Sequence, residues 1–165
     1  MATTASPYGL KAVNHIGGTP YAGSTRLLPI ASGYASNIFN GSIVSIVAAG
    51  TVEMVTVTGN GGGGAAASFP AGTIGVFVGC TYSDPVTGNL TFNQYWPSGT
   101  VAADAQAYII DDPDVVFMAQ ADAAVTQADL GQNTHLAAAQ STTTGYTQNG
   151  NSNTAVDATT ATTAT

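Results

Sequence analysis

Two apolar runs that meet at an acidic proline corner constrain the fold of this chain more than any other stretch. Within Ala105–Ala121, the runs Ala107–Ile110 and Val115–Met118 are rich in β-branched and aromatic residues, which suit a half-buried pleated surface. Between them lies Asp111–Asp114, where Pro113 has a fixed φ and no backbone donor, so a strand must bend or break there. Aspartate side chains favour such a turn because they accept backbone hydrogen bonds. We therefore expect two strands joined by a structural bend that binds no metal ion.

Apolar runs bounded by turn residues predict further strands on both sides of that corner. Pro29 interrupts Arg26–Ala31 and marks it as an edge strand. Two hairpins are expected, one from Ser42–Ala48 to Val52–Thr58 and one from Thr73–Tyr82 to Leu90–Trp96. The other predicted elements are a flexible loop at Gly59–Ala67, one capped helical turn within Ala123–Gln132 and a last strand at His135–Ala139. Together these patterns predict an all-β fold, a small β-barrel or β-sandwich with long Gly-rich loops.

The two ends of the chain differ in composition from its middle. Pro7–Arg26 is interrupted by Gly, Pro and Asn so often that a long helix is excluded and an irregular extended segment is expected. Ser141–Thr165 is rich in Thr, and Tyr146 and Val156 are its only large apolar residues. We expect this tail to pack no core of its own and to be ordered, if at all, by lying on neighbouring chains. The predicted division is an extended N-terminal arm at 1–25, a β domain at 26–140 and a Thr/Ser/Ala-rich tail or linker at 141–165.

The charge of the chain excludes several classes of partner. Only 7% of the residues are charged, and nine acidic residues against two basic ones give a net charge of −7. Nucleic acid and anionic membrane surfaces are therefore not expected as partners, because no basic patch can form. No apolar stretch approaches the length of a membrane span, and the N-terminus has no secretory signal pattern. Cys80 is the only cysteine, so it has no partner for an intrachain disulfide, and its apolar neighbours indicate a buried side chain.

No stretch has the spacing of a catalytic or metal-binding motif, so we expect no catalytic residues, no cofactor and no metal ion. The acidic corner lacks the spacing of a calcium loop, and His15, His135 and Cys80 are too far apart for a typical zinc motif. Tyr95 and Trp96, with Phe92, are candidates for stacking against a sugar or a base. Aromatic residues on a strand more often belong to a core, and we favour that interpretation.

Five groups of residues, taken in chain order, carry a resemblance to a known family. They are Pro7, Gly9, Leu10, His15, Gly17, Gly18, Tyr21 and Arg26; Gly75–Cys80 with Tyr82; Phe92, Tyr95, Trp96, Pro97 and Thr100; Asp111–Phe117 with Gln120 and Ala121; and Leu130, Gly131 and Asn133 with Ser141–Gly145. In this pattern the chain resembles a family of tailed-phage virion structural proteins, the head-decoration or capsid cement proteins, common in marine phages. Relatives continue past a Ser/Thr/Ala linker into one more apolar β segment, which leaves room for a further piece beyond Thr165.

The resemblance implies a non-catalytic virion protein, made in the host cytoplasm and carried on the outer capsid surface. Its implied partner is the phage major capsid protein, whose shell it would bind and stabilise as a homo-oligomer, a trimer or a dimer. We expect the arm and the tail to supply much of the contact, the arm by adding its backbone to the edge of a neighbouring sheet. The candidate interface residues are Pro7, Tyr8, Lys11, His15, Tyr21 and Arg26. Lys11 and Arg26 are the cations expected to meet an acidic partner.

A second function stays open at this point. A receptor-binding or fibre-associated module of a phage virion would recognise a host glycan through exposed aromatic rings. Exposure of Trp96 and Tyr95 would favour that alternative, and burial of both would favour the cement protein.

Overall fold

The computed structural model describes residues 6–55, 71–137 and 145–160. These residues form eight strands and one short 3-10 helix, which confirms the prediction of an all-β fold. The elements are β1 (Lys11–His15), β2 (Arg26–Pro29), β3 (Ile43–Ile46), β4 (Val52–Met54), β5 (Thr73–Ser83), β6 (Leu90–Asn93), β7 (Gln106–Ile110), β8 (Val115–Met118) and η1 (Gln127–Asp129). Among the described residues no helix is long and apolar enough to cross a membrane.

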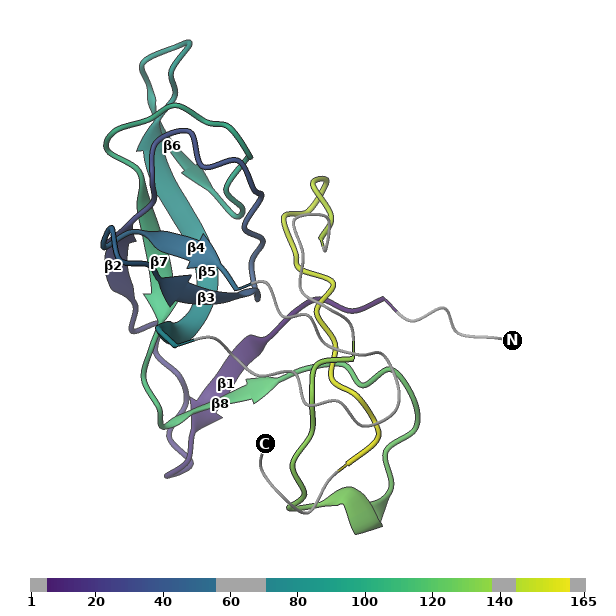
Figure 1. The fold of residues 1–165 in the computed structure, drawn as a ribbon. Coiled ribbons are helices and arrows are strands. Elements are labelled where there is room, and N and C mark those ends of the chain that lie inside the picture. The colour runs from purple at the N-terminus through teal and green to yellow at the C-terminus, as the bar shows by residue number, and fades with distance from the viewer. Residues whose placement is uncertain (1–5, 56–70, 138–144, 161–165) are drawn as a thin grey trace.

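A six-stranded antiparallel sheet forms the larger part of the fold (Figure 1). Its hydrogen-bonded order is β2-β7-β5-β3-β4, and β6 pairs with the far end of the long strand β5. Both predicted hairpins are confirmed, because β3 pairs with β4 and β5 pairs with β6. The predicted edge strand is confirmed as well, since β2 lies at one end of the sheet and ends at Pro29. The last part of the first hairpin, Thr56–Thr58, and the loop Gly59–Ala67 lie outside the described residues.

The strands on either side of the acidic corner belong to different sheets. β7 is an inner strand of the large sheet, whereas β8 pairs with β1 in a separate two-stranded sheet. The turn at Pro113–Asp114 lies between the two strands, and the Asp112 carboxylate accepts a hydrogen bond from the Asp114 amide at 2.9 Å. The predicted bend is therefore confirmed, and its structural consequence is to carry the chain from one sheet to the other.

The main core lies against one face of the large sheet. Side chains from directly paired residues point to the same face, so Phe77 and Ile109 share it, as do Cys80 and Ala107. Trp96, fully buried, packs edge-on against Tyr82 with ring centroids 5.4 Å apart. Connecting segments that contain Ile30, Ile38, Ala102 and Ala105 complete this cluster. A smaller cluster of Val55 and Leu136, with Ile43 beside it, joins the sheet to the C-terminal part of the chain.

Two details of the predicted fold differ from the structure. Neither sheet closes into a barrel, so the barrel alternative is wrong. The last strand expected at His135–Ala139 is absent from the part that the structure describes, where Leu136 makes a single bridge to Val156. The capped turn is confirmed at η1, because Thr126 donates to the Asp129 carboxylate from its amide and its hydroxyl, both at 2.8 Å.

The described parts of both chain ends are bonded to the rest of the same chain. At the N-terminal end, β1 pairs with β8 and the Leu10 amide donates to the Gly41 carbonyl at 3.0 Å. At the C-terminal end, residues 145–160 form a strap, drawn in yellow in Figure 1, that runs past both sheets. The amides of Ser152, Val156 and Asp157 donate to the carbonyls of Asn40, Gln120 and His135, respectively. The expectation that the tail is ordered by neighbouring chains is therefore wrong for residues 145–160.

Candidate interaction surfaces

Three of the predicted interface residues gather around the acidic corner. Arg26, at the start of β2, donates to the Asp111 carboxylate at 2.8 Å, and the His15 Nδ1 atom lies 3.8 Å from the carboxylate of Asp112. The His15 ring also lies 5.9 Å from that of Tyr21, centroid to centroid. Partial burial, and then the negative charge of Asp112, raise the pKa of Tyr21. These contacts fasten the end of β1 and the start of β2 to the bend between the sheets.

The remaining predicted interface residues lie at the other end of β1. Pro7 and Tyr8 are half-buried, and the Lys11 ammonium lies 4.8 Å from the centre of the Tyr8 ring, within the range of a cation–π contact. The six residues are therefore not one surface but two groups separated by the length of β1. Arg26 is also not a free cation for a partner, because Asp111 already pairs with it. The edge of β1 expected to add to a neighbouring sheet is likewise paired with β8 on one side.

The β1–β8 sheet presents an apolar outer face. Along β8 exposure alternates, since Val116 and Met118 are exposed at 40% and 51% while Val115 and Phe117 point inward. On β1, Val13 sits at the irregularity in the pairing and is 50% exposed. Ile16, just after β1, is exposed too. This face was not predicted from the sequence, because Val115–Met118 is apolar throughout and its residues do not indicate which side of the strand is exposed.

The β5–β6 hairpin carries a second exposed apolar surface. Its turn residue Val86 and the β6 residues Leu90 and Phe92 are largely exposed. The nearby carboxylates are engaged within the chain: Asp84 accepts from the amides of Val86 and Thr87, and Asp104 accepts from Ser83. These hydrogen bonds lower the pKa of both aspartates. We call Val86, Leu90 and Phe92 the hairpin patch; Figure 1 shows that this hairpin projects at one end of the molecule.

The aromatic residues that would mark a glycan site do not form an exposed platform. Trp96 is fully buried, and its indole N–H points to the Tyr34 carbonyl at 3.4 Å. Tyr95 is half-buried and stacks on Phe39, with centroids 5.6 Å apart and ring planes 19° apart. Only Phe92 of the three is exposed. The preference for a core position is confirmed for Trp96 and wrong for Phe92.

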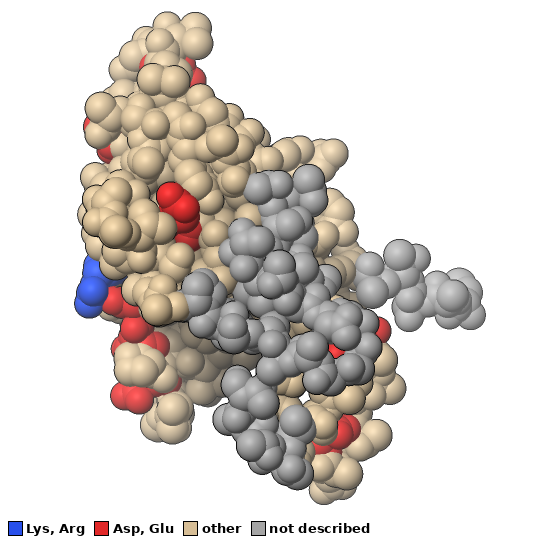
Figure 2. Space-filling model, in the orientation of Figure 1, with Lys and Arg blue, Asp and Glu red and all other residues tan. Residues whose placement is uncertain are grey.

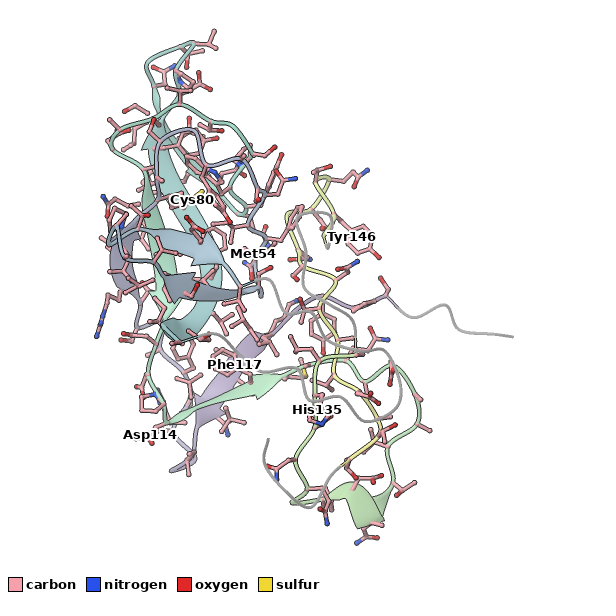
Figure 3. The ribbon with its side chains drawn as sticks, viewed as in Figure 1. Met54, Cys80, Asp114, Phe117, His135 and Tyr146 are labelled. Carbon is pink, nitrogen blue, oxygen red and sulfur yellow. The ribbon has the colours of Figure 1, made fainter. Side chains whose placement is uncertain are left out.

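An apolar pocket of about 250 Å³ lies between the inner face of the small sheet and the large sheet. Phe117, which Figure 3 shows pointing from β8 toward the large sheet, contributes to its wall. The other lining residues are Leu10, Ile43, Thr73, Gly75 and Val76. Because the lining that the described residues form is almost entirely carbon, the pocket offers few polar groups with which to orient a substrate.

The titratable side chains do not assemble into a reactive cluster in the described parts of the chain. No three histidine, cysteine or carboxylate side chains among those residues lie close enough together to hold a metal ion. Cys80 is buried, and its burial raises the pKa of the thiol to about 12, which keeps it protonated at neutral pH. His135 is half-buried near the C-terminal strap, far from Cys80 in Figure 3.

The space-filling view shows how little of the surface is charged. Most of the face in Figure 2 is neither acidic nor basic, and the acidic atoms lie in small separate patches. The geometry therefore offers two interaction surfaces, the outer face of β1–β8 and the hairpin patch, whose centres consist mainly of apolar side chains. Comparison with known proteins found no matching family model, no similar curated protein and no similar solved structure.

Proposed function

We propose that this protein is a phage virion structural protein of the capsid decoration or cement type. It binds the outer surface of the major capsid shell in many copies as a homo-oligomer and stabilises the shell through surface complementarity, without catalysis. The resemblance of the chain to that family suggested this role, and one structural observation supports it most directly. The hairpin patch places three large apolar side chains on a projecting hairpin whose neighbouring carboxylates are already hydrogen-bonded within the chain.

Such a surface suits a permanent protein interface. Removing apolar side chains from water lowers the free energy of the complex, whereas desolvation of charged groups raises it. Exposed apolar patches on a folded domain are typical of interaction sites, and these three exposed side chains share one hairpin. The contact surface proposed here is thus the hairpin patch rather than the N-terminal arm, because β1 and Arg26 are engaged within their own chain.

The alternative function is a receptor- or glycan-binding module associated with the phage fibre. Exposed Phe92 is the observation that favours it, since one aromatic ring at a surface can stack on a sugar. Burial of Trp96 and stacking of Tyr95 on Phe39 count against it, because they remove the other two rings of the expected platform.

A binding experiment with capsids that lack the protein tests the proposal. Purified protein is added to such capsids, and occupancy is measured after the unbound protein is removed. We expect saturable binding at many sites per shell and a higher temperature of genome release. Phe92→Glu should reduce occupancy at least tenfold, because a charge would be buried in the contact.

Val101→Glu is the matched control for that variant. Val101 is exposed, lies outside the hairpin patch and should tolerate the same added charge. Equal loss of binding by both variants, or saturation at only a few sites, would contradict the proposal. Binding of the protein to host-surface glycans, abolished by Phe92→Ala, would support the alternative instead.

A further inference from the structure

The outer face of the β1–β8 sheet has a charge pattern that matters for what it can bind. Residues directly opposite each other on paired strands point to the same face, which places Lys11 beside Met118 and Asn14 beside Val116. The Ile16 amide donates to the Asp114 carbonyl at 2.8 Å, so the pairing continues by one more pair beyond the strands. Lys11 therefore lies at one end of this face and Asp114 at the other, with apolar side chains between them.

Both end charges are available to a partner. Asp114 is exposed and lies at the corner where β8 begins (Figure 3). In the described parts of the chain, Arg26 pairs with Asp111 and the His15 ring lies near the Asp112 carboxylate, and neither contact involves Lys11 or Asp114. Lys11 touches the Tyr8 ring, a contact that leaves its positive charge unneutralised.

From this pattern we infer that the outer face of β1–β8 binds the same face of a second copy of the chain in a two-fold symmetric dimer. The symmetry axis lies within the interface and runs across the strands, so each strand lies antiparallel to its counterpart. That arrangement brings Lys11 of each copy to Asp114 of the other, twice by symmetry. Val13, Val116 and Met118 of both copies are then buried between the two ion pairs, as a self-complementary interface requires.

Charge complementarity favours a second copy of the chain, in this orientation, as the partner of the outer face. The opposite orientation, in which like ends meet, would place Lys11 against Lys11 and Asp114 against Asp114, and it is disfavoured by repulsion at both ends. The four residue-to-residue steps from Asp114 to Met118 span about 14 Å, so the two ion pairs are separate contacts at the two rims. The outer face of β1–β8 is therefore complementary in charge to the same face of a second copy.

The expected dimer is weak. Two-stranded faces bury less than the roughly 1,600 Å² of a standard protein interface, so we expect a dissociation constant on the order of 10–1,000 μM. Such an affinity is sufficient for dimer formation where many copies are held close together on one surface, because the high local concentration compensates for the weak affinity. The inference specifies the oligomer in the proposed function and does not depend on the capsid assignment.

Analytical ultracentrifugation of the full chain between about 5 μM and 1 mM tests the dimer. We expect a concentration-dependent monomer–dimer equilibrium. Val116→Glu should weaken dimerisation at least tenfold, because the two glutamates would be buried near each other. Val101→Glu carries the same substitution at an exposed position away from this face and should leave the equilibrium unchanged. Circular dichroism of each variant establishes that it is folded.

A charge exchange tests the orientation. Lys11→Glu and Asp114→Lys should each weaken the dimer severalfold, because each variant brings two like charges together at both rims. The double variant restores opposite charges and should recover most of the affinity. Both positions are exposed, so these variants test the interface without disturbing the core.

Several outcomes would overturn the inference. They are a monomer at all concentrations up to 1 mM, an oligomer other than a dimer, and single charge variants that dimerise like the wild type. A double variant as weak as the single ones would reject the proposed orientation. None of these results would affect the proposed binding to the capsid shell, which is tested by occupancy of the shell and by Phe92→Glu.

Discussion

At the scale of single residues, two glycines fix how the N-terminal segment meets the large sheet. Gly9 and Gly41 have φ values of +78° and +86°, in a region that other residues rarely adopt. Their backbones touch: a Cβ atom on Gly41 would lie 2.7 Å from the Leu10 nitrogen. This close approach allows the Leu10 amide to reach the Gly41 carbonyl, and it sets the position from which β1 starts. The glycines are visible in the sequence, but their contact is not, because it joins residues far apart in the chain.

Gly41→Ala should therefore destabilise the protein strongly. We expect the free energy of unfolding to fall by about 2–4 kcal/mol, from backbone strain together with the steric clash. Gly33→Ala is the control, because Gly33 also has a positive φ of +74° but has open space around it. That variant should lose only about 1–2 kcal/mol. Urea unfolding measures both, and equal losses in the two variants would contradict the close contact.

At the scale of elements, local sequence patterns predicted the hairpins, the edge strand and the capped turn, but they did not predict the long-range strand pairing. The two hairpins, the edge strand and the capped turn follow from turn residues and from alternation within a short stretch. The pairing of β1 with β8 joins residues about a hundred positions apart, and no local pattern specifies it. The exposed face of that sheet was missed for the same reason, since a strand's solvent side is defined only once its partner and the neighbouring sheet are known.

Carboxylates at the ends of two elements should make stability depend on pH. Hydrogen bonds from Ser83 lower the pKa of Asp104, and those from Thr126 lower the pKa of Asp129. A carboxylate whose pKa is lower in the folded state stabilises the fold above its ordinary pKa of about 4, and this contribution is lost as pH falls through the folded-state value. We therefore expect the melting temperature to fall as pH drops from about 5 to about 2.

Asp104→Asn tests the origin of that dependence. The amide cannot ionise, so the variant should be less stable than the wild type at pH 7 and should approach it at pH 2. Asp122→Asn is a comparison on another carboxylate, which accepts from the Ala158 amide. A difference in melting temperature between Asp104→Asn and the wild type that is the same at both pH values would contradict a role for Asp104 ionisation in this pH dependence.

The C-terminal strap shows how composition can mislead. Residues 145–160 contain almost no large apolar side chains, yet Ser152, Thr154, Ala155 and Asp157 are buried. Backbone hydrogen bonds to other segments of the chain hold the strap, and these contacts are independent of side-chain hydrophobicity. Gly145 contributes by its lack of a side chain, because a Cβ atom there would lie 2.2 Å from the Phe39 ring.

Hydrogen exchange on the monomer tests the strap. The amides of Ser152, Val156 and Asp157 should exchange at least a hundredfold more slowly than in an unfolded chain, because each donates to a carbonyl of another segment. Thr147 and Gln148, in the exposed turn of the strap, should exchange quickly. Fast exchange at all five positions in dilute protein would mean that the strap is not held by its own chain.

At the scale of the whole molecule, the structure combines a weakly charged surface with two separate apolar surfaces. The hairpin patch projects from the large sheet, and the outer face of β1–β8 lies on the small sheet (Figure 1). A protein with two such surfaces can bind a shell through one and its own copy through the other. Composition predicted the low charge and the absence of a basic patch. It could not locate the contact surfaces, because exposure of an apolar residue depends on the complete fold.

A cryo-EM reconstruction of intact virions, combined with a protein count per particle, tests the central claim most directly. The account predicts density for this fold at many symmetry-related positions on the outer capsid surface, with the hairpin patch against the shell. A few copies confined to the tail or its fibres would contradict the capsid assignment and support the receptor-binding alternative.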